Sequence, residues 1–458
     1  MAMRILRYTA AALVLIVVIL MLVFRPDRAV RVAAGLTAHN LCSATFVARL
    51  DPDATFKEQV QVIIDGPASE LVHYNVDRTQ RSIDASFAWI IHARASYTPG
   101  YGCRLDYPEN VPAPVPLADT SDTPQESAIV PPLNPQIAAA LDRVFSDDKT
   151  QPVKNVKAVV IVKNGRVIAE RYAPGFGPDT PLLSYSVAKS FTNALLGILV
   201  RDGRLRIDQP AGAPEWQNAG DPRAKITVED LMRMRSGLDA REAETAFAPI
   251  AQMEYAHADM AGFAAQHALK QPPGTHWEYT SANTLILARL LGKTVGGGAE
   301  GMRAFAGREL FAPLGMAGVT MEFDGAGVFV GSSYVYAPAR AYARFGELYL
   351  NDGVTPQGRR ILPEGWVAWS RRSTLNMAYG AGFWTNDGPS RMAASRVKQG
   401  FPKDGFFASG DLGQRIYIVP SERLVVARFG YSQPPKFGID DDIALIDATI
   451  RSTRDINH

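Results

Sequence analysis

Apolar and polar positions follow two different periods along this chain, and the changes of period separate strand-forming from helix-forming stretches. Residues 156–162 are almost continuously apolar, and residues 167–172 form a second strand-like run after Asn164-Gly165. Asn-Gly is the dipeptide that the type I′ turn of a two-residue hairpin prefers, because both turn residues need a positive φ. We therefore expect an antiparallel β-hairpin here.

The middle of the chain has the 3.6-residue period of amphipathic helices. Its strongest example is the stretch 182–205, where apolar residues at 195, 196, 198 and 199 form a wide face and Gly203 supplies a stop signal. Further helices are expected at residues 136–146, 227–234, 256–269, 282–292, 299–310, 338–351 and 440–452.

After Pro363 the pattern returns to short strands, which are expected at residues 382–385, 405–409, 415–419 and 424–429. Strands at both ends with helices between them imply an antiparallel sheet that is closed by the N- and C-terminal segments of one domain. We predict an α+β fold over residues 136–458, in which helices flank the sheet and a helical subdomain is inserted between its strands.

Residues 29–107 are expected to form a small β-rich extension. Its strand-like pieces lie at residues 44–50, 60–64, 71–76 and 86–91, and turn-forming pairs separate them. Residues 108–135 are rich in proline, serine, threonine and aspartate, which is typical of a linker or of an extended strap along a surface.

The first 28 residues contain one uninterrupted, mostly apolar run, residues 9–24, with arginines on both sides. This run is short for a full bilayer span but long for the apolar core of a signal peptide. A small-residue cleavage site at 32–34 would lie well beyond the run and behind the arginines. We therefore favour an uncleaved signal anchor, a membrane helix that leaves the rest on the periplasmic or extracytoplasmic face of the inner membrane, over a removed signal peptide.

The composition is that of a globular chain of 458 residues, of which 47% are hydrophobic and 21% are charged. The formal net charge is +2 and no basic block occurs, so nothing indicates a nucleic-acid partner. Cys42 and Cys103 can form a disulfide if the chain is exported to an oxidising compartment. No C-x-x-C pair, H-E-x-x-H motif or complete P-loop is present, so neither a metal nor a cofactor is expected.

Ser186 and Lys189 are the first candidates for chemistry. Ser186 lies at or next to the N-cap of the predicted central helix, and Lys189 projects from the same side of its first turn. A serine hydroxyl is a weak nucleophile unless a neighbouring group takes its proton, which a neutral lysine in a desolvated pocket can do. The same S-x-x-K spacing occurs at 146–149 and 395–398, but neither stretch is followed by a long apolar helix. Context therefore selects Ser186, whose alternative is an ordinary capping serine beside a surface lysine.

Tyr279 is the second candidate. It comes directly before the apolar helix expected at 282–292, with Ser281 two residues further on. A phenol facing Ser186 across a cleft can act as a general base and then as a general acid toward the leaving group. The plain alternative is a tyrosine at the edge of the core. The similar Tyr349-Leu350-Asn351 lies at a helix end before a turn, so we set it aside.

The third candidate is the strand and turn at residues 405–414. Small residues such as Ser409 and Gly410 at its end let a substrate carbonyl approach the backbone closely. An amide N–H in this stretch, together with that of Ser186, can form an oxyanion hole. A glycine-rich hairpin turn without any catalytic role is the alternative.

Taken in this order, the three stretches resemble the serine β-lactamase and penicillin-binding family. The nearest likeness is to the class C branch with its esterase and 6-aminohexanoate-dimer hydrolase relatives, from about residue 136 to the C-terminus. Its most specific part is SYSVAKSFTNALLGILVRDGRL. The resemblance implies a β-lactamase/transpeptidase-like fold. It also implies that Ser186 is acylated, that Lys189 is its proton partner and that Tyr279 is a second acid/base.

The resemblance assigns two further sets of residues. The backbone N–H groups of Ser186 and Asp411 would form the oxyanion hole, and Ser281, Ser409 and Gly410 would contact the substrate. Class C enzymes have Tyr-x-Asn where this chain has Ser281, and Lys-Thr-Gly where it has Ala408-Ser409-Gly410. The missing lysine would hold a substrate carboxylate. The chain thus looks more like the amide and ester hydrolases of the family than like its β-lactamases.

We therefore expect a serine hydrolase that cleaves a small-molecule amide or ester through an acyl-enzyme. Two alternatives stay open: a D,D-peptidase or β-lactamase acting on cell-wall peptides or β-lactams, and a catalytically silent, membrane-tethered binding module on the same fold. A Ser-His-Asp hydrolase is disfavoured, because the chain has no G-x-S-x-G elbow.

Overall fold

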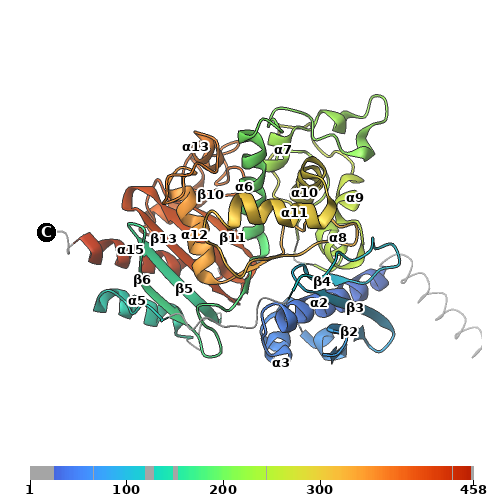
Figure 1. The fold of residues 1–458 in the computed structure, drawn as a ribbon, viewed down its shortest axis with the longest axis horizontal. Coiled ribbons are helices and arrows are strands. Elements are labelled where there is room, and N and C mark those ends of the chain that lie inside the picture. The colour runs from blue at the N-terminus through green and yellow to red at the C-terminus, as the bar shows by residue number, and fades with distance from the viewer. Residues whose placement is uncertain are drawn as a thin grey trace, which may run out of the picture.

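The main part of the protein is built around one central helix, which lies between a sheet and a group of other helices (Figure 1). The structure, a computed structural model, describes residues 25–64, 66–118, 128–147, 153–243, 245–435 and 437–454. The predicted hairpin is confirmed as β5 (Val156–Lys163) and β6 (Arg166–Tyr172), which are antiparallel. Asn164 and Gly165 have φ values of 52° and 75°, as a type I′ turn requires.

The main sheet has six antiparallel strands in the order β10-β11-β12-β13-β5-β6. The four C-terminal strands are β10 (Trp384–Thr385), β11 (Phe406–Gly410), β12 (Gln414–Val419) and β13 (Leu424–Gly430). All four were predicted to within a few residues. Because β13 pairs with β5, the N- and C-terminal segments close one sheet, as the sequence pattern indicates.

Helices cover both faces of this sheet, which explains why every residue of β13 is buried. Helix α12 (Ala339–Leu350) packs on one face, while α5 (Pro135–Phe145) and α15 (Ile439–Arg454) cover the other (Figure 1). At Gly346 of α12, an added Cβ would lie 2.6 Å from a side-chain carbon of Val425. Glycine thus lets the helix approach the sheet closely, and all three helices agree with the prediction.

The helical part contains α6 (Ala188–Arg201), α7 (Val228–Met232), α8 (Pro249–Ala256), α9 (Met260–Ala265), α10 (Ser281–Val295) and α11 (Gly298–Ala306), which continues as a π-helical turn, Gly307–Phe311. The helix predicted at 256–269 is confirmed only in its centre, as α9, and α8 was not predicted. Asp259 accepts a hydrogen bond from Gly262 N and caps a new helix, so α8 and α9 are separate.

Smaller elements surround this framework and were not predicted. They are α13 (Trp366–Arg371), α14 (Arg391–Lys398) and a three-stranded sheet of β7 (Leu182–Leu183), β9 (Val335–Ala337) and β8 (Thr320–Met321). The S-x-x-K stretch 395–398, which no long apolar helix follows, forms the end of α14. It ends a helix rather than opening one, because the chain turns at Gly400, where φ is 107°.

Residues 26–105, here called the N-terminal layer, combine a long helix with a second sheet. Helix α2 (Pro26–Phe46) packs on four antiparallel strands in the order β1-β2-β3-β4. The strands are β1 (Val72–Asp77), β2 (Ser82–Phe87), β3 (Ile91–Thr98) and β4 (Gly102–Leu105). The strand predicted at 71–76 is confirmed, and the stretch 86–91 spans the end of β2 and the turn into β3.

Two strand predictions in the N-terminal layer are wrong. Residues 44–46 end α2, and residues 60–64 lie in a π-helical turn, Phe56–Val60, and in α4 (Gln61–Ile64). Asp51 accepts a hydrogen bond from Ala54 N and starts α3 (Pro52–Thr55) just before them. Short apolar runs do not distinguish a strand from a helical turn, so this local capping decided the outcome.

The N-terminal layer is cross-linked internally and joined to the main part through buried groups. A disulfide between Cys42 and Cys103 links α2 to β4. Glu322 of the main part is completely buried, and its carboxylate accepts hydrogen bonds from Ser43 Oγ at 2.7 Å and from Cys103 N at 2.8 Å. His39 Nε2 lies 3.1 Å from its other oxygen.

The proline-rich stretch contains no helix or strand within its described residues up to the start of α5. Val111 N bonds to Gly325 O, and Glu170 N bonds to Val130 O, so these parts lie along the main domain. None of the helices in the described residues is both long and apolar enough to cross a bilayer. The predicted anchor run, residues 9–24, lies outside the described residues.

Candidate active site

Ser186 lies in a 3₁₀ turn, Tyr185–Val187, that leads into α6. Tyr185 has a positive φ of 42°, a conformation that costs free energy for a residue with a side chain. Ser184 anchors the turn, because its hydroxyl donates to Ser333 O and accepts from Val335 N, both at 3.0 Å. The turn buries Tyr185 and Val187 but leaves Ser186 partly exposed, as a nucleophile must be.

Lys189 is buried, with 3% of its surface exposed, and it contacts the nucleophile directly. Its Nζ donates to Ser186 Oγ and to Ser281 Oγ, both at 2.8 Å, and to Ser332 O at 3.1 Å. Burial lowers the pKa of Lys189, an effect that the negative charges of Glu242 and Glu254 partly oppose. A lysine with a lowered pKa can lose its proton and then accept one from Ser186.

Tyr279 and Ser281 stand at the start of α10, as the sequence predicts. The N-cap residue Thr280 fixes this start, since its hydroxyl accepts from Ala282 N and donates to Ala240 O. Tyr279 is partly exposed, and its phenol lies close enough to the Ser186 hydroxyl for that hydroxyl to act on the pKa of Tyr279. Burial first and the charge of Glu242 second raise the pKa of Tyr279 well above its ordinary value, so the phenol is protonated in the resting site.

Aromatic rings hold Tyr279 in place. Trp384 stacks on it with ring centroids 5.7 Å apart, and Tyr379 meets it edge-on at 5.6 Å. The Lys189 ammonium lies 5.0 Å from the centroid of the same ring. The hydroxyl of Ser186, the amine of Lys189 and the phenol of Tyr279 are therefore brought together by the fold.

Glu242 is a site residue that sequence reasoning missed. Its carboxylate accepts from Ser281 N at 2.5 Å and from Ser281 Oγ at 2.9 Å. Ser281, expected to contact substrate, is instead 1% exposed and bridges Glu242 to Lys189. Glu242 belongs to a loop with no recognisable motif, so only the three-dimensional contact identifies it.

The third predicted stretch lies beside the nucleophile. Strand β11 ends at Gly410, where an added Cβ would lie 2.3 Å from Ser184 O and 3.0 Å from Ser186 N. Only glycine permits this approach. Ser409 and Gly410 are partly exposed and Asp411, the next residue, is exposed, so the strand end borders the site on its open side.

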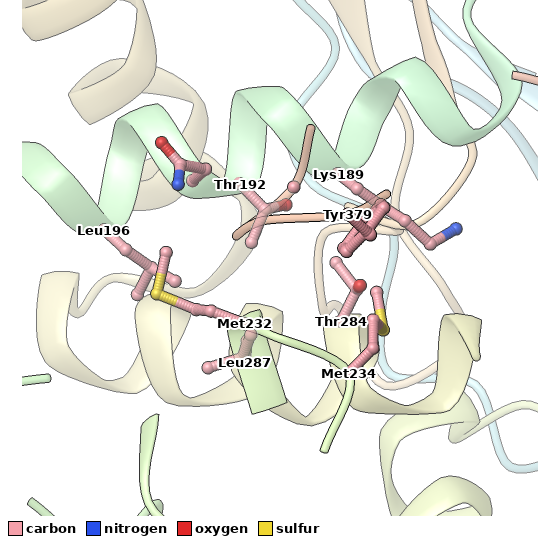
Figure 2. Close-up of a pocket in the computed structure, with 10 residues that line it drawn as sticks. Lys189, Thr192, Leu196, Met232, Met234, Thr284, Leu287 and Tyr379 are labelled. Carbon is pink, nitrogen blue, oxygen red and sulfur yellow. The ribbon is translucent and has the colours of Figure 1, made fainter. Parts of the chain in front are cut away.

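Behind Lys189 a small cavity separates α6 from α10 (Figure 2). Its volume is about 10 Å³, which is at the lower limit for one water molecule. Its lining includes Thr192, Met232, Thr284 and Tyr379. The cavity leaves room for at most about one water molecule beside Lys189, in agreement with the burial that lowers its pKa.

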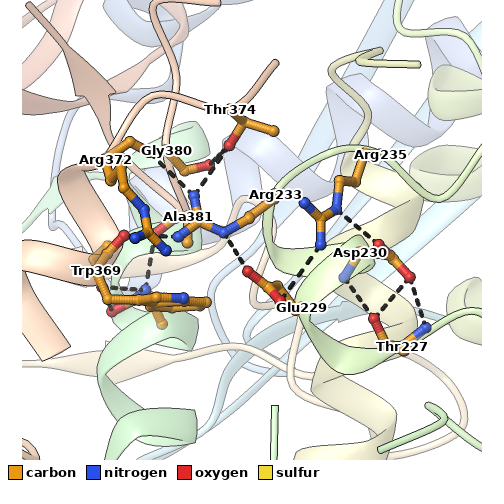
Figure 3. Close-up of polar contacts among 12 residues, drawn as sticks. Thr227, Glu229, Asp230, Arg233, Arg235, Trp369, Arg372, Thr374, Gly380 and Ala381 are labelled. Atoms are coloured by element: carbon orange, nitrogen blue, oxygen red, sulfur yellow. Dashed lines mark hydrogen bonds and ion pairs between the residues drawn. The ribbon is translucent and has the colours of Figure 1, made fainter. Parts of the chain in front are cut away.

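A second buried cation, Arg233, fixes the wall of the site that carries Tyr379 (Figure 3). Its guanidinium donates to the Glu229 carboxylate at 2.8 Å, to Trp369 O at 2.8 Å and to Arg372 O at 3.0 Å. The same segment continues to Gly382, where an added Cβ would lie 3.1 Å from Lys189 O. Arg233 thus holds the chain that packs against the start of α6.

Comparison with known proteins identifies the family to which the chain belongs. A family model described as beta-lactamase matches residues 141–449, which is more than half of the chain. The chain belongs to the β-lactamase family. Within the described residues, no three His, Cys, Asp or Glu side chains are grouped so that they could bind a metal ion.

Proteins that are similar to this chain in sequence or in fold carry the names of hydrolases. The 6-aminohexanoate-dimer hydrolase of Paenarthrobacter ureafaciens is 29% identical over 224 residues, which are 46% of this chain and 55% of that protein. The match thus spans about half of the relative's length. A Bacillus anthracis protein provisionally named as such a hydrolase has a TM-score of 0.56 and 20% identity over 66% of this chain and 80% of that one. A family VIII carboxylesterase has a TM-score of 0.53 and 16% identity over 71% and 99%. At these identities the two structures show the fold alone.

Proposed function

We propose that this protein is a serine hydrolase of small-molecule amides or esters that works through an acyl-enzyme on Ser186. The observation that carries the proposal is Lys189 Nζ, buried and 2.8 Å from Ser186 Oγ, next to the Tyr279 hydroxyl. A serine, a lysine with lowered pKa and a protonated phenol are the groups that acyl transfer needs. The names of the relatives agree with this chemistry.

The first half of the reaction forms the acyl-enzyme. Neutral Lys189 accepts the proton of Ser186 as Oγ attacks the substrate carbonyl. The backbone N–H groups of Ser186 and Asp411 stabilise the negative oxygen, a role that the closeness of Gly410 to Ser186 N supports. Tyr279 donates its proton to the leaving amine or alcohol and recovers one from Lys189.

The second half releases the acid. Water enters from the open side, where Ser186 and Ser409 are partly exposed. Tyr279 and Lys189 reverse their roles and remove a proton from the water as it attacks the ester carbonyl. Glu242 keeps Ser281, and through it the Lys189 amine, in a fixed position.

Covalent labelling tests the proposal. The full-length chain in detergent should react with a fluorophosphonate probe at Ser186, and Lys189→Ala or Tyr279→Phe should slow the reaction strongly. Lys157→Ala is the matched control, because Lys157 is also buried but pairs with Glu58 at 2.9 Å, away from the site. Equal labelling of all three variants, or none of the wild-type protein, would contradict the proposal.

The same preparation separates the remaining alternatives. A hydrolysis screen over p-nitrophenyl esters, short amides and nitrocefin, with release of terminal D-alanine measured beside it, distinguishes a general amidase or esterase from a β-lactamase or D,D-peptidase. We expect turnover of esters and amides and little of nitrocefin, because residues 408–410 lack the lysine that would hold a substrate carboxylate. A silent binding module would neither be labelled nor turn over any substrate.

We also propose that the chain is anchored in the inner membrane and that its folded part lies on the extracytoplasmic face. The apolar run at 9–24 and the disulfide between Cys42 and Cys103 support this placement. The full-length protein should stay with membranes after an alkaline carbonate wash, and a variant without residues 1–24 should be released. Protease added to spheroplasts should digest the folded part; protection from it would contradict the orientation.

A further inference from the structure

A second carboxyl group is connected to Lys189 through residues 332–333. Glu254, on α8, is 9% exposed and accepts a hydrogen bond from Ser333 Oγ at 2.6 Å. The neighbouring residue Ser332 contacts both groups: its hydroxyl lies 3.5 Å from the Glu254 carboxylate, and its carbonyl accepts from Lys189 Nζ. Glu254 and Lys189 are therefore held on either side of one short segment.

Several groups face Glu254, and they balance its charge. Burial and the charge of Glu242 raise its pKa, while the Ser333 hydrogen bond and the charges of Lys189 and His39 lower it, with a result of about 7. The charge of Glu254 also raises the pKa values of four tyrosines, which are Tyr185, Tyr255, Tyr279 and Tyr334. The proton of Glu254 can thus be gained or lost near neutral pH.

The N-terminal layer holds α8, and with it Glu254, in place. At Gly35 of α2 an added Cβ would lie 2.3 Å from Tyr255 O, so the two helices touch backbone to backbone. Gln252 of α8 donates to Arg28 O at 3.2 Å, and His39 of α2 stacks on Tyr334 with ring centroids 4.2 Å apart. The β-lactamase match begins at residue 141, so this layer lies outside the matched region.

We propose that Glu254 is a positioning residue that sets the charge state of Lys189, and that the N-terminal layer keeps it in place. The proposal rests on the hydrolase function given above. A negative Glu254 favours the protonated lysine, which cannot act as a base. A neutral Glu254 removes that attraction, so Lys189 gives up its proton at lower pH.

The pH dependence of labelling tests this role. In the full-length protein, the rate of fluorophosphonate reaction at Ser186 should rise with pH as Lys189 loses its proton. Glu254→Gln keeps the size of the side chain but removes its charge, so the rising limb should move to lower pH by about one unit. Ser333→Ala should move it in the same direction by less, because loss of that hydrogen bond makes Glu254 harder to ionise.

Glu322→Gln is the matched control. Glu322 is also a buried carboxylate with a serine donor and contacts the N-terminal layer, but it does not touch Lys189 or the residues bonded to it. Its variant should lower the thermal midpoint and leave the limb in place. If Glu254→Gln behaves like Glu322→Gln, with an unmoved limb, the positioning role is wrong while the labelling of Ser186 still supports the hydrolase. If the wild-type protein is not labelled at all, the hydrolase itself fails.

The part played by the N-terminal layer has its own test. Gly35→Ala pushes α2 and α8 apart and should move the limb in the direction of Glu254→Gln. Gly177→Ala is the control, because a Cβ there meets nothing within 4 Å. If a folded Gly35→Ala protein shows no change in the rising limb of the labelling rate, the N-terminal layer does not help to position Glu254. If that variant does not fold, Glu254→Gln still decides the role of the carboxyl group.

Discussion

Arg233 and Lys189 are both buried cations of the main domain, yet their surroundings differ in one respect. Burial lowers the pKa of each. Arg233 has a carboxylate partner, Glu229, at 2.8 Å, and its guanidinium lies 4.4 Å from the Trp369 ring centroid. Lys189 bonds to two hydroxyls and a carbonyl, and no described carboxylate lies within ion-pair distance of it.

This difference gives Arg233 a structural role and allows Lys189 to take part in proton transfer. A guanidinium does not lose its proton in proteins, so its burial is stable only with a paired charge and filled hydrogen bonds. An amine among neutral oxygens keeps its hydrogen bonds in either protonation state, so it can give up its proton at modest cost. In this protein the charges that act on Lys189, Glu242 and Glu254, do so from a distance.

The largest effect on turnover should come from replacing Lys189 by arginine or from removing the Ser186 hydroxyl. Lys189→Arg places a permanently charged group beside Ser186, and Ser186→Ala removes the nucleophile. Each should reduce turnover by at least about 10³-fold, and the double variant should be little worse because the two residues act as a unit. Burst and steady-state kinetics on the best ester from the screen measure this. A burst that persists in Ser186→Ala would refute the acyl-enzyme.

Removing the structural cation should reduce stability instead. Arg233→Met leaves Glu229 with Arg235 alone, at 3.4 Å, and takes the donor away from Trp369 O and Arg372 O, so it should lower the free energy of unfolding by roughly 1–3 kcal/mol. Urea unfolding followed by circular dichroism measures the loss. The double variant Arg233→Met/Glu229→Gln should recover part of it; if it does not, the ion pair is not the cause.

The titration of buried carboxyl groups should make stability depend on pH. Glu254 and Asp324 have pKa values of about 7 in the folded protein, above those of ordinary carboxyl groups. The folded state therefore binds more protons than the unfolded state between about pH 4 and 7. The contribution of these carboxyl groups to the free energy of unfolding is fully present below about pH 4. It is lost as the pH rises through 7, by on the order of 2 kcal/mol per group. Unfolding at several pH values should show a shallower decline in Glu254→Gln, and an identical decline would contradict the assignment.

The smallest effect should come from the cap of the helix that precedes Arg233. Thr227 and Asp230 form a capping box at the start of α7. Thr227→Ala should cost about 1 kcal/mol of unfolding free energy. Because this cap lies on the Arg233 side, labelling of Ser186 should keep its rate and pH limb. A changed limb would mean that the two cations are not independent.

Local sequence signals predicted much of the main domain. The Asn164-Gly165 turn and the apolar faces of α10 and α12 each act within a few residues, so the same local preference holds in the unfolded and in the folded chain. In the N-terminal layer the pattern at 60–64 fits a strand or a helical turn equally well. The cap at Asp51 and the packing against α2 favour the helical turn at residues 60–64.

The sequence alone determined Ser186, Lys189 and Tyr279 as candidates, because the motifs around them are set by the helix starts on which they lie. Only the tertiary structure assigned a place to Glu242, 39 residues from its partner Ser281, and to Glu254, 79 residues from Ser333. Neither glutamate has a local signal. The state of Lys189 depends on burial and on charges from distant segments, and those exist only once the chain has folded around it.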